Sequence, residues 1–160
     1  MPDHIQLRPI REGDAAFLLR VYASTREEEL AVVDWNDAQK DAFLRMQFNA
    51  QHQHYQAHFP DARFDIIERD GQGVGRLYVD RRPDDIRVID IALLPEHRNH
   101  GIGAALVTQL LDEGQRDGKT VSIHVERNNR ALSFYERLGF GFVQDEGVYF
   151  LLEKPPTANA

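Results

Sequence analysis

The sequence predicts a mixed α/β (α+β) fold in which one strongly twisted sheet of six or seven strands carries helices on both faces. Apolar residues recur at helical spacing before residue 59, and an alternation of period two takes over from Phe64. Between residues 86 and 125 a strand, a glycine loop, an amphipathic helix and a second strand follow one another. That order is typical of a crossover between parallel strands.

The first third of the chain supplies an edge strand and two helices. Residues 6–10 alternate apolar and polar side chains and stop at a proline, as a short edge strand does. Asp14 is the expected cap of the first helix, whose apolar positions are Phe17, Leu18, Val21 and Tyr22. The second helix covers about residues 38–58 and has two apolar rows. We therefore expect both of its sides to be covered, either by the domain itself or by a substrate.

The middle of the chain supplies most of the sheet. Residues 64–68 and 74–80 are predicted to form a hairpin. Residues 86–94 are the most apolar stretch, which predicts a central strand that is covered on both faces. The amphipathic helix that follows ends near Gly114 to Gly118, and residues 121–125 form the parallel partner strand.

The last part of the chain closes the sheet. Residues 131–138 form a short helix, and residues 140–144 and 147–152 form a closing hairpin. We expect residues 1–154 to be a single domain and residues 155–160 to be a frayed tail.

Composition excludes several classes of function. The 160 residues include 26 acidic and 19 basic side chains, with a net charge of -7 and no cysteine. Disulfides, thiolate metal sites and a cysteine nucleophile are therefore excluded. An acidic balance argues against a nucleic-acid partner, and no apolar run is long enough to span a membrane. We expect a cytoplasmic protein with no signal peptide.

The most informative segment joins the central strand to the amphipathic helix. It reads Pro-Glu-His-Arg-Asn-His-Gly-Ile-Gly-Ala-Ala-Leu from Pro95 to Leu106. At such a junction the first backbone amides of a helix have no helical partner and can bind an anion, and two glycines allow the ligand to approach closely. A pyrophosphate fits this chemistry. The alternative is an ordinary tight turn before a helix.

Two motifs resemble the GNAT superfamily of N-acetyltransferases. Arg98-x-x-Gly101-x-Gly103-Ala104 after the strand resembles motif A of that superfamily. The segment from Val125 to Phe140, with its Asn, Ala, Tyr and Leu-Gly-Phe pattern, is similar to motif B. The motifs occur in the family order, and the elements match over nearly the whole chain.

The resemblance implies a site for acetyl-CoA. The loop would hold its pyrophosphate through Arg98, Asn99, His100, Gly101, Ile102, Gly103 and Ala104. The pantetheine arm would pair with the strand end at Leu93 and Leu94. Asn99 stands where the family usually has glycine, and asparagine is the residue other than glycine that best tolerates a positive φ.

The resemblance also implies catalytic groups. Tyr135 corresponds to the tyrosine that protonates the departing thiolate, and the alternative is an aromatic side chain that only holds a short helix. Asn129, or in the other register Asn128, would bind the cofactor or the loop, with a helix cap as the alternative use.

The base that deprotonates the amine is less clearly marked by the sequence. Asp90 is the leading candidate, because it is a carboxylate in an apolar strand near the cofactor, and His124 in the parallel strand is the second. For both residues the alternative is a buried polar group that its neighbours satisfy.

His52, His54 and His58 lie on the long helix without a carboxylate in a metal-binding arrangement, so we expect no metal. In the alternative interpretation, these histidines line the acceptor cavity together with Gln51 and Tyr55.

These observations predict an N-acetyltransferase that moves an acetyl group from acetyl-CoA directly to an amine in a ternary complex. The expected acceptor is a small molecule or a peptide, with neither nucleic acid nor membrane as a partner, and a homodimer stays open. The alternatives are a CoA-binding sensor without catalysis and a transferase for another acyl group.

Overall fold

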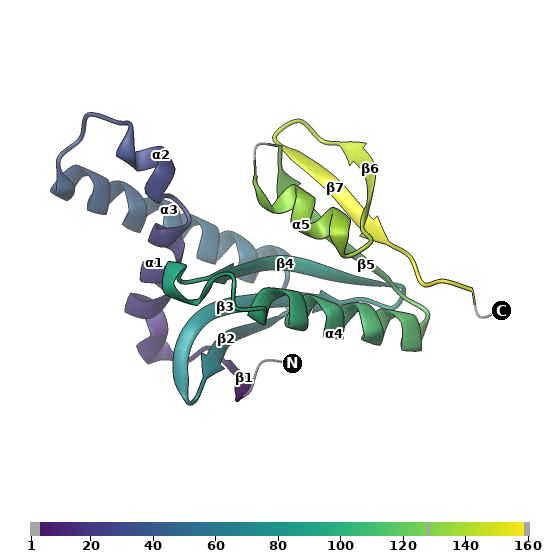
Figure 1. Ribbon diagram of the computed structural model, residues 1–160. Helices are drawn as coiled ribbons and strands as arrows, with labels where there is room; N and C mark the ends of the chain where they lie inside the picture. Colours follow the sequence, from purple (N-terminus) through teal and green to yellow (C-terminus); the bar gives the residue numbers. More distant parts are fainter. Residues whose placement is uncertain (1–3, 128, 159–160) are drawn as a thin grey trace.

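A computed structural model describes residues 4–127 and 129–158, and within them seven strands form one sheet in the order β1-β2-β3-β4-β5-β7-β6 (Figure 1). Only β4 and β5 pair in parallel, and every other neighbouring pair is antiparallel. The strands are β1 (Ile5–Pro9), β2 (Arg63–Arg69), β3 (Gln72–Arg81), β4 (Asp85–Leu93), β5 (Thr120–Glu126), β6 (Gly141–Asp145) and β7 (Tyr149–Lys154). The helices are α1 (Ala15–Ser24), α2 (Glu27–Ala31), α3 (Asp37–His58), α4 (Ile102–Asp117) and α5 (Ala131–Arg137), with short 3₁₀ turns η1 (Glu12–Asp14) and η2 (Pro95–His97).

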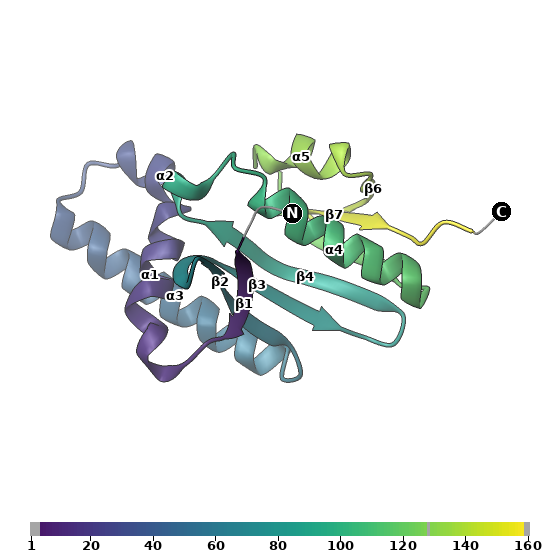
Figure 2. The ribbon, with the colours of Figure 1, turned by 60° about the horizontal axis from the view of Figure 1, so that its bottom comes forward.

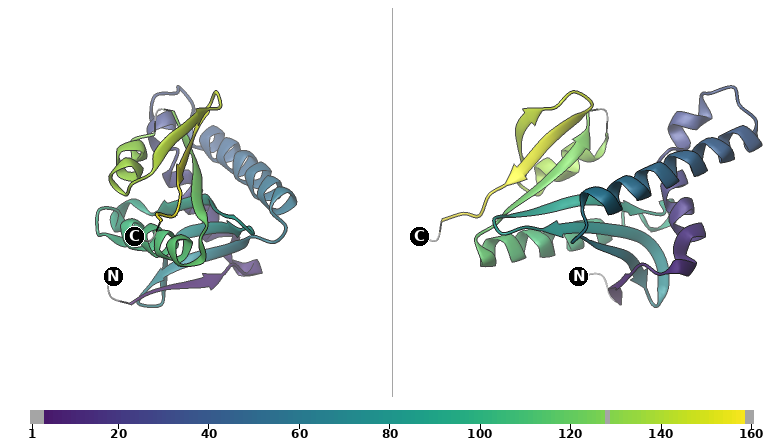
Figure 3. Two further views of the ribbon diagram at one scale, coloured as in Figure 1. Left: turned by 90° about the vertical axis from the view of Figure 1, so that its right-hand side faces the viewer. Right: turned by 180° about the vertical axis from the view of Figure 1, so that it is seen from behind.

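Helices cover both faces of the sheet, as the sequence predicts. Figure 2 and the left view of Figure 3 show α1 and α3 on one face and α4 and α5 on the other. The larger core lies under α4, where Leu106, Val107 and Leu110 meet the inward residues of β3, β4 and β5. A smaller core under α3 joins Leu18, Tyr22, Phe48 and Ile66. The expected central strand is β4, the fourth of the seven.

One expectation for the N-terminal helices holds only in part, and a second is wrong. Asp14 occupies the N-cap position of α1, but its side chain makes no capping hydrogen bond, because both carboxylate oxygens accept hydrogen bonds from Arg8 at 2.8 Å. A third helix, α2, precedes β2 where we expected two helices. Its five residues are too few to show a helical period in the sequence.

One of the two apolar rows of α3, the row that contains Met46, is also not covered by the domain. Phe48 is buried, and Leu44 and Tyr55 on its side are partly buried. The other row is exposed, and Met46 in it keeps 62% of its surface accessible. Two apolar rows predict a helix that is covered on both sides, but the domain covers only one side of α3.

Strands β4 and β5 begin together and then diverge, which opens the sheet. Their pairing runs only from Asp85 opposite Thr120 to Val88 opposite Ile123. Figure 1 shows the two strands separating from there toward α1 and α2. We call this divergence the β4–β5 splay, meaning residues 89–93 of β4 and 124–126 of β5. Backbone groups on the β5 side of residues 89–93 therefore have no strand neighbour.

Thr157, near the end of the described chain, contacts α4. Its amide donates to the Gln115 side-chain oxygen at 2.8 Å, and its carbonyl accepts from the Gln115 side-chain nitrogen at 2.8 Å. Of the helices in the described part of the chain, none combines the length and the apolar character that a membrane crossing needs.

Candidate active site

The loop before α4 has the backbone of an anion site. Asn99 and Gly101 take the left-handed conformation, with φ of 62° and 81°. The positive φ expected at Asn99 is thus present. Helical hydrogen bonding starts with the Ala105 amide, which donates to the Gly101 carbonyl at 3.0 Å. The amides before it, at Ile102, Gly103 and Ala104, have no partner within the helix and point from its positive end.

The space above this helix end suits a ligand. A side chain at Gly103 would first meet Phe134 at 3.9 Å and Leu93 at 4.0 Å, so the small residue leaves the backbone approachable. Ile102 is buried in the larger core and anchors the turn, while His100 is exposed. The loop therefore presents amides rather than side chains.

The Arg98 side chain lies away from those amides. Its Nε donates to the Leu93 carbonyl at 3.0 Å, and its Nη2 lies 3.4 Å from the carbonyl and hydroxyl oxygens of Ser24. Arg98 therefore ties the end of α1 to the end of β4. Its charge lies beside the loop, where it adds positive potential without extending into the turn.

The two strand-end residues expected to meet the pantetheine arm face opposite edges of β4. The Leu94 amide donates to Val74 of β3 at 2.9 Å, so Leu94 is used within the sheet. Backbone groups of successive strand residues alternate in direction, which turns the Leu93 amide toward the splay. The Leu93 carbonyl on that side is held by Arg98. Leu93 is thus available through its amide, and Leu94 is not.

Asp90 lies on β4 just past the point where the strands diverge. Its Oδ2 accepts from Arg76 Nη2 at 2.5 Å, and the Tyr55 hydroxyl lies 3.5 Å from the same oxygen. Arg76 Nη2 also donates to Gln51 at 2.8 Å. Burial, together with the charge of Asp90, raises the pKa of Tyr55. Asp90 is thus a satisfied ion-pair partner, as the alternative states, and it lies in the part of β4 that has no β5 neighbour. Its role as the base stays a prediction.

Tyr135 is deeply buried. It is 5% exposed, whereas the adjacent Phe134 is only partly buried. Its ring packs against Phe134 and Phe140, with ring centres 5.1 and 5.7 Å away. Burial raises the pKa of Tyr135, and the charge of Asp90 adds to this rise. The hydroxyl therefore stays protonated at neutral pH, as a donor must.

Asn129 is used locally. Its side-chain oxygen accepts from the Ala131 amide at 2.8 Å, which holds the first turn of α5. This is the helix-start use that we gave as the alternative to cofactor binding. Asn128, the other register, lies outside the described residues.

His124 belongs to a separate polar cluster. Its Nε2 lies 2.9 Å from Glu146, and its Nδ1 lies 3.1 Å from Arg87. Burial and the charge of Arg87 lower its pKa, and Glu146 opposes them. Both ring nitrogens are thus engaged, as the alternative of a hydrogen-bonded histidine states.

The histidines of α3 separate into two environments. His52 stacks on Phe48 with ring centres 5.8 Å apart, and burial followed by the charge of Arg76 lowers its pKa. His54 and His58 are exposed and lie against each other, 3.9 Å between ring centres. No group of three or more potential metal ligands occurs in the described part of the chain.

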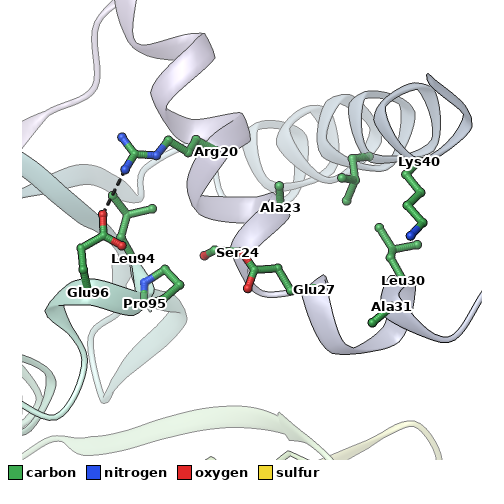
Figure 4. Close-up of a pocket in the computed structure, with 11 residues that line it drawn as sticks. Arg20, Ala23, Ser24, Glu27, Leu30, Ala31, Lys40, Leu94, Pro95 and Glu96 are labelled. Atoms are coloured by element: carbon green, nitrogen blue, oxygen red, sulfur yellow. Dashed lines mark hydrogen bonds and ion pairs between the residues drawn. The ribbon is translucent and has the colours of Figure 1, made fainter. Parts of the chain in front are cut away.

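An open cleft of about 580 Å³ lies beside the site, between the N-terminal helices and the end of β4 (Figure 4). Leu30 and Leu44 supply apolar lining, and Arg20 pairs with Glu96 at 3.0 Å across one side. Sequence reasoning missed this cleft and also missed Arg76. The cleft joins residues 20–44 to residues 94–96, and Arg76 has the pattern of an ordinary polar position in a hairpin strand, so no local signal marks either.

Comparison with known proteins agrees with this geometry. The model of the acetyltransferase (GNAT) family matches residues 18–140. The chain belongs to the GNAT family. The predicted family and fold are thereby confirmed.

Individual relatives of this GNAT chain are distant. A Drosophila melanogaster protein described as the probable N-acetyltransferase san is 27% identical over 75 residues, which is 45% of this chain and 41% of that protein. The chain thus spans less than half of that relative.

Two solved structures share the fold. The PaiA N-acetyltransferase of Thermoplasma acidophilum, in complex with coenzyme A, superposes with a TM-score of 0.71 at 19% identity, covering 94% of this chain and 98% of the other. Arabidopsis thaliana Naa50, in complex with the bisubstrate analogue CoA-Ac-MVNAL, gives 0.58 at 18% identity, covering 94% and 98%.

Proposed function

We propose that this GNAT chain transfers an acetyl group from acetyl-CoA directly to an amine acceptor, and that residues 1–154 form the catalytic domain. The observation that carries the proposal is the loop before α4, where a left-handed Asn99 and Gly101 lead into three helix amides without helical partners. Amides in this arrangement bind phosphate groups. The coenzyme A complex of the Thermoplasma relative supports the same ligand.

The described residues fit acetyl-CoA at two points. The amides of Ile102, Gly103 and Ala104 would receive the pyrophosphate, and Arg98, held on the Leu93 carbonyl, would add positive potential next to the loop. The Leu93 amide, on the splay side of β4, would bind the thioester carbonyl oxygen and stabilise the negative charge that develops there. When bound, acetyl-CoA supplies an activated acyl carbon with a thiolate leaving group.

Asp90 and Tyr135 have complementary parts in the proton transfers. A protonated amine gives one proton to the Asp90 carboxylate, and its lone pair then forms a bond to the acyl carbon. The carbon–sulfur bond breaks, and its electron pair leaves on sulfur. Tyr135 donates a proton to that sulfur and regains one from the new amide nitrogen. The products are the N-acetyl amide, CoA thiol and one proton, which Asp90 releases to solvent.

Transfer would be direct, because the chain has no cysteine to carry an acyl intermediate. A bisubstrate analogue joins CoA to a peptide in the Arabidopsis structure, which supports a ternary complex and a peptide as one class of acceptor. Small-molecule amines are the other class.

The test has two steps. Isothermal titration of acetyl-CoA into the purified protein should give one binding site, and absence of binding would refute the proposal. A screen of polyamines, aminoglycosides and peptides should then show CoA release that depends on the amine. Binding without release from any amine would instead support the CoA-binding sensor. Release with propionyl-CoA in preference to acetyl-CoA would support the other alternative, a different acyl group.

A further inference from the structure

A buried arginine lies under the candidate site on the face of the sheet that α3 covers. Arg76 is in the middle of β3, and its side chain is 3% exposed. Its Nη2 donates to Asp90 and to Gln51, at 2.5 and 2.8 Å. The guanidinium also lies 5.0 Å from the ring centre of Tyr78. Arg76 is therefore held between β4, α3 and its own strand.

A β-bulge brings Asp90 to this arginine. Val79 pairs with Val88 and Tyr78 pairs with Asp90, so Ile89 has no partner on β3. Without that extra residue, Ile89 would oppose Tyr78, and the side chain at position 90 would point into the larger core with Leu77. The bulge moves the carboxylate to the α3 face, diagonal to Arg76. Bulges that redirect a side chain are frequent next to active sites.

Stability alone is a poor reason for this pair. Removing an arginine and a carboxylate from water costs several kcal/mol per ion, and apolar residues of similar volume often stabilise a fold as well or better. Burial lowers the pKa of Arg76, but the charge of Asp90 and the neighbouring tyrosines raise it by more. The guanidinium thus stays charged.

One carboxylate oxygen of Asp90 remains free for a ligand. Arg76 donates a hydrogen bond to Oδ2, and the Tyr55 hydroxyl lies 3.5 Å from the same oxygen. Oδ1 accepts no hydrogen bond from any residue in the described ranges, and the Asp90 side chain is 17% exposed. Because β4 has no β5 neighbour after Val88, a group at this position can be reached from the splay.

We propose that Arg76 is a positioning residue that holds Oδ2 of Asp90 so that Oδ1 receives the ammonium of a cationic primary amine acceptor. The inference rests on the proposed function and adds to it a residue that positions the base. Gln51 and Tyr55 belong to the same arrangement, which connects the long helix α3 to the reacting end of β4. Arg76 itself touches no reacting atom and acts only through Asp90.

A double-mutant cycle tests whether Arg76 acts through Asp90. The variants are Arg76→Met, Arg76→Lys, Asp90→Asn and the double variant Arg76→Met with Asp90→Asn. The matched control is Arg45→Met, which breaks an exposed Arg–Asp pair on the surface of α3. Spermidine, kanamycin and a hexapeptide with a free N-terminus serve as amine probes. The readouts are kcat, the KM for the amine and the KM for acetyl-CoA, and thermal melting reports folding.

For every amine that the wild type acetylates, Arg76→Met should raise the amine KM at least tenfold and leave the KM for acetyl-CoA within twofold. Arg76→Lys should recover part of the lost amine affinity. If Arg76→Met does not fold, Arg76→Lys replaces it in the comparison with Asp90→Asn. The double variant should be no worse than Asp90→Asn alone, and Arg45→Met should match the wild type.

Three outcomes overturn the inference. Effects of Arg76→Met and Asp90→Asn that multiply in the double variant would show that Arg76 acts independently of Asp90. A parallel rise in the KM for acetyl-CoA would indicate general loosening of the sheet, and an unchanged amine KM would exclude positioning. In each of these cases the wild type is active, so the proposed function stands. A wild type that releases no CoA with any probe refutes the proposed function, and this inference with it.

Discussion

The loop before α4 and the Asp90 position lie at opposite ends of the unpaired part of β4, and they are built from different groups. The loop presents backbone amides, oriented by two left-handed residues and the start of a helix. The Asp90 position depends on buried side chains from β3, β4 and α3, aligned by one extra residue in β4. A backbone site should therefore tolerate most side-chain changes and fail when its φ angles change. A side-chain site should behave in the opposite way.

The largest effect that would test this contrast is expected for Gly101→Val. A β-branched residue at φ 81° is strained, and its side chain would block approach to the amides. We expect at least about a hundredfold loss of acetyl-CoA affinity by isothermal titration, a loss that corresponds to roughly 2.7 kcal/mol.

Gly71→Val is the matched control, because Gly71 has φ 78° in a hairpin turn with nothing near its Cβ position. It should lower the melting temperature and leave acetyl-CoA binding unchanged. Retained affinity in Gly101→Val would mean that the ligand does not bind at this loop.

The next effect concerns the Tyr135 hydroxyl. Tyr135→Phe should lower kcat by about a hundredfold or more and leave both KM values nearly unchanged, since general acid catalysis contributes on that scale. Stability should be kept, because the hydroxyl has no hydrogen-bond partner among the described residues.

Tyr149→Phe makes the same change at an exposed position of β7 and should have no effect on kcat. Because the pKa of Tyr135 is raised above its usual range, kcat should show no loss from tyrosine ionisation up to pH 9. Equal turnover of Tyr135→Phe and the wild type would remove the acid from the mechanism.

A smaller effect, on stability at low pH, is expected for His52, whose ring feels the charge of Arg76. The folded-state pKa of His52 lies below its ordinary value, because of burial and then the charge of Arg76. The unfolded chain therefore binds a proton more readily, so stability is fully present above pH 6.5 and declines as the pH falls below it.

His52→Gln should reduce the fall in melting temperature between pH 7 and pH 5 by about a degree or two. His54→Gln, on the exposed side of α3, is the control and should follow the wild type. A fall in melting temperature of the same size in His52→Gln and in the wild type would show that His52 does not cause the loss of stability.

The smallest effect is expected for Asn99→Gly. Glycine relieves the cost of φ 62° but gains freedom in the unfolded chain, so stability should change by less than about 1 kcal/mol. If the loop works through its backbone, acetyl-CoA affinity should stay within about twofold by titration. A tenfold loss would show that the Asn99 side chain itself binds the ligand.

The same contrast explains what could be predicted from the sequence. Gly101, Gly103 and the helix after them are adjacent in the chain, so the loop was recognisable, and so was the parallel pairing of β4 with β5. The direction of the Asp90 side chain depends on the bulge at Ile89, and an extra residue in a strand leaves no local mark. Arg76 became visible only when strand register placed it diagonal to Asp90.

The errors elsewhere have similar causes. Asp14 has a carboxylate suited to capping, but Arg8, adjacent only in the folded chain, binds it more strongly. Tyr135 is buried while the more apolar Phe134 beside it is only partly buried, because the direction in which α5 packs, rather than residue type, decides which ring enters the core. Local chemistry predicts which groups are able to interact, and tertiary contacts decide between them.

The most direct test of acetyl transfer is the release of free thiol from acetyl-CoA as a function of amine concentration. Since the chain has no cysteine, every thiol detected in the assay comes from CoA. We predict that release by the wild type rises with the amine and saturates, and that Tyr135→Phe reduces the plateau. Thiol release that is the same with and without every amine tested, in a protein that binds acetyl-CoA, would contradict the account.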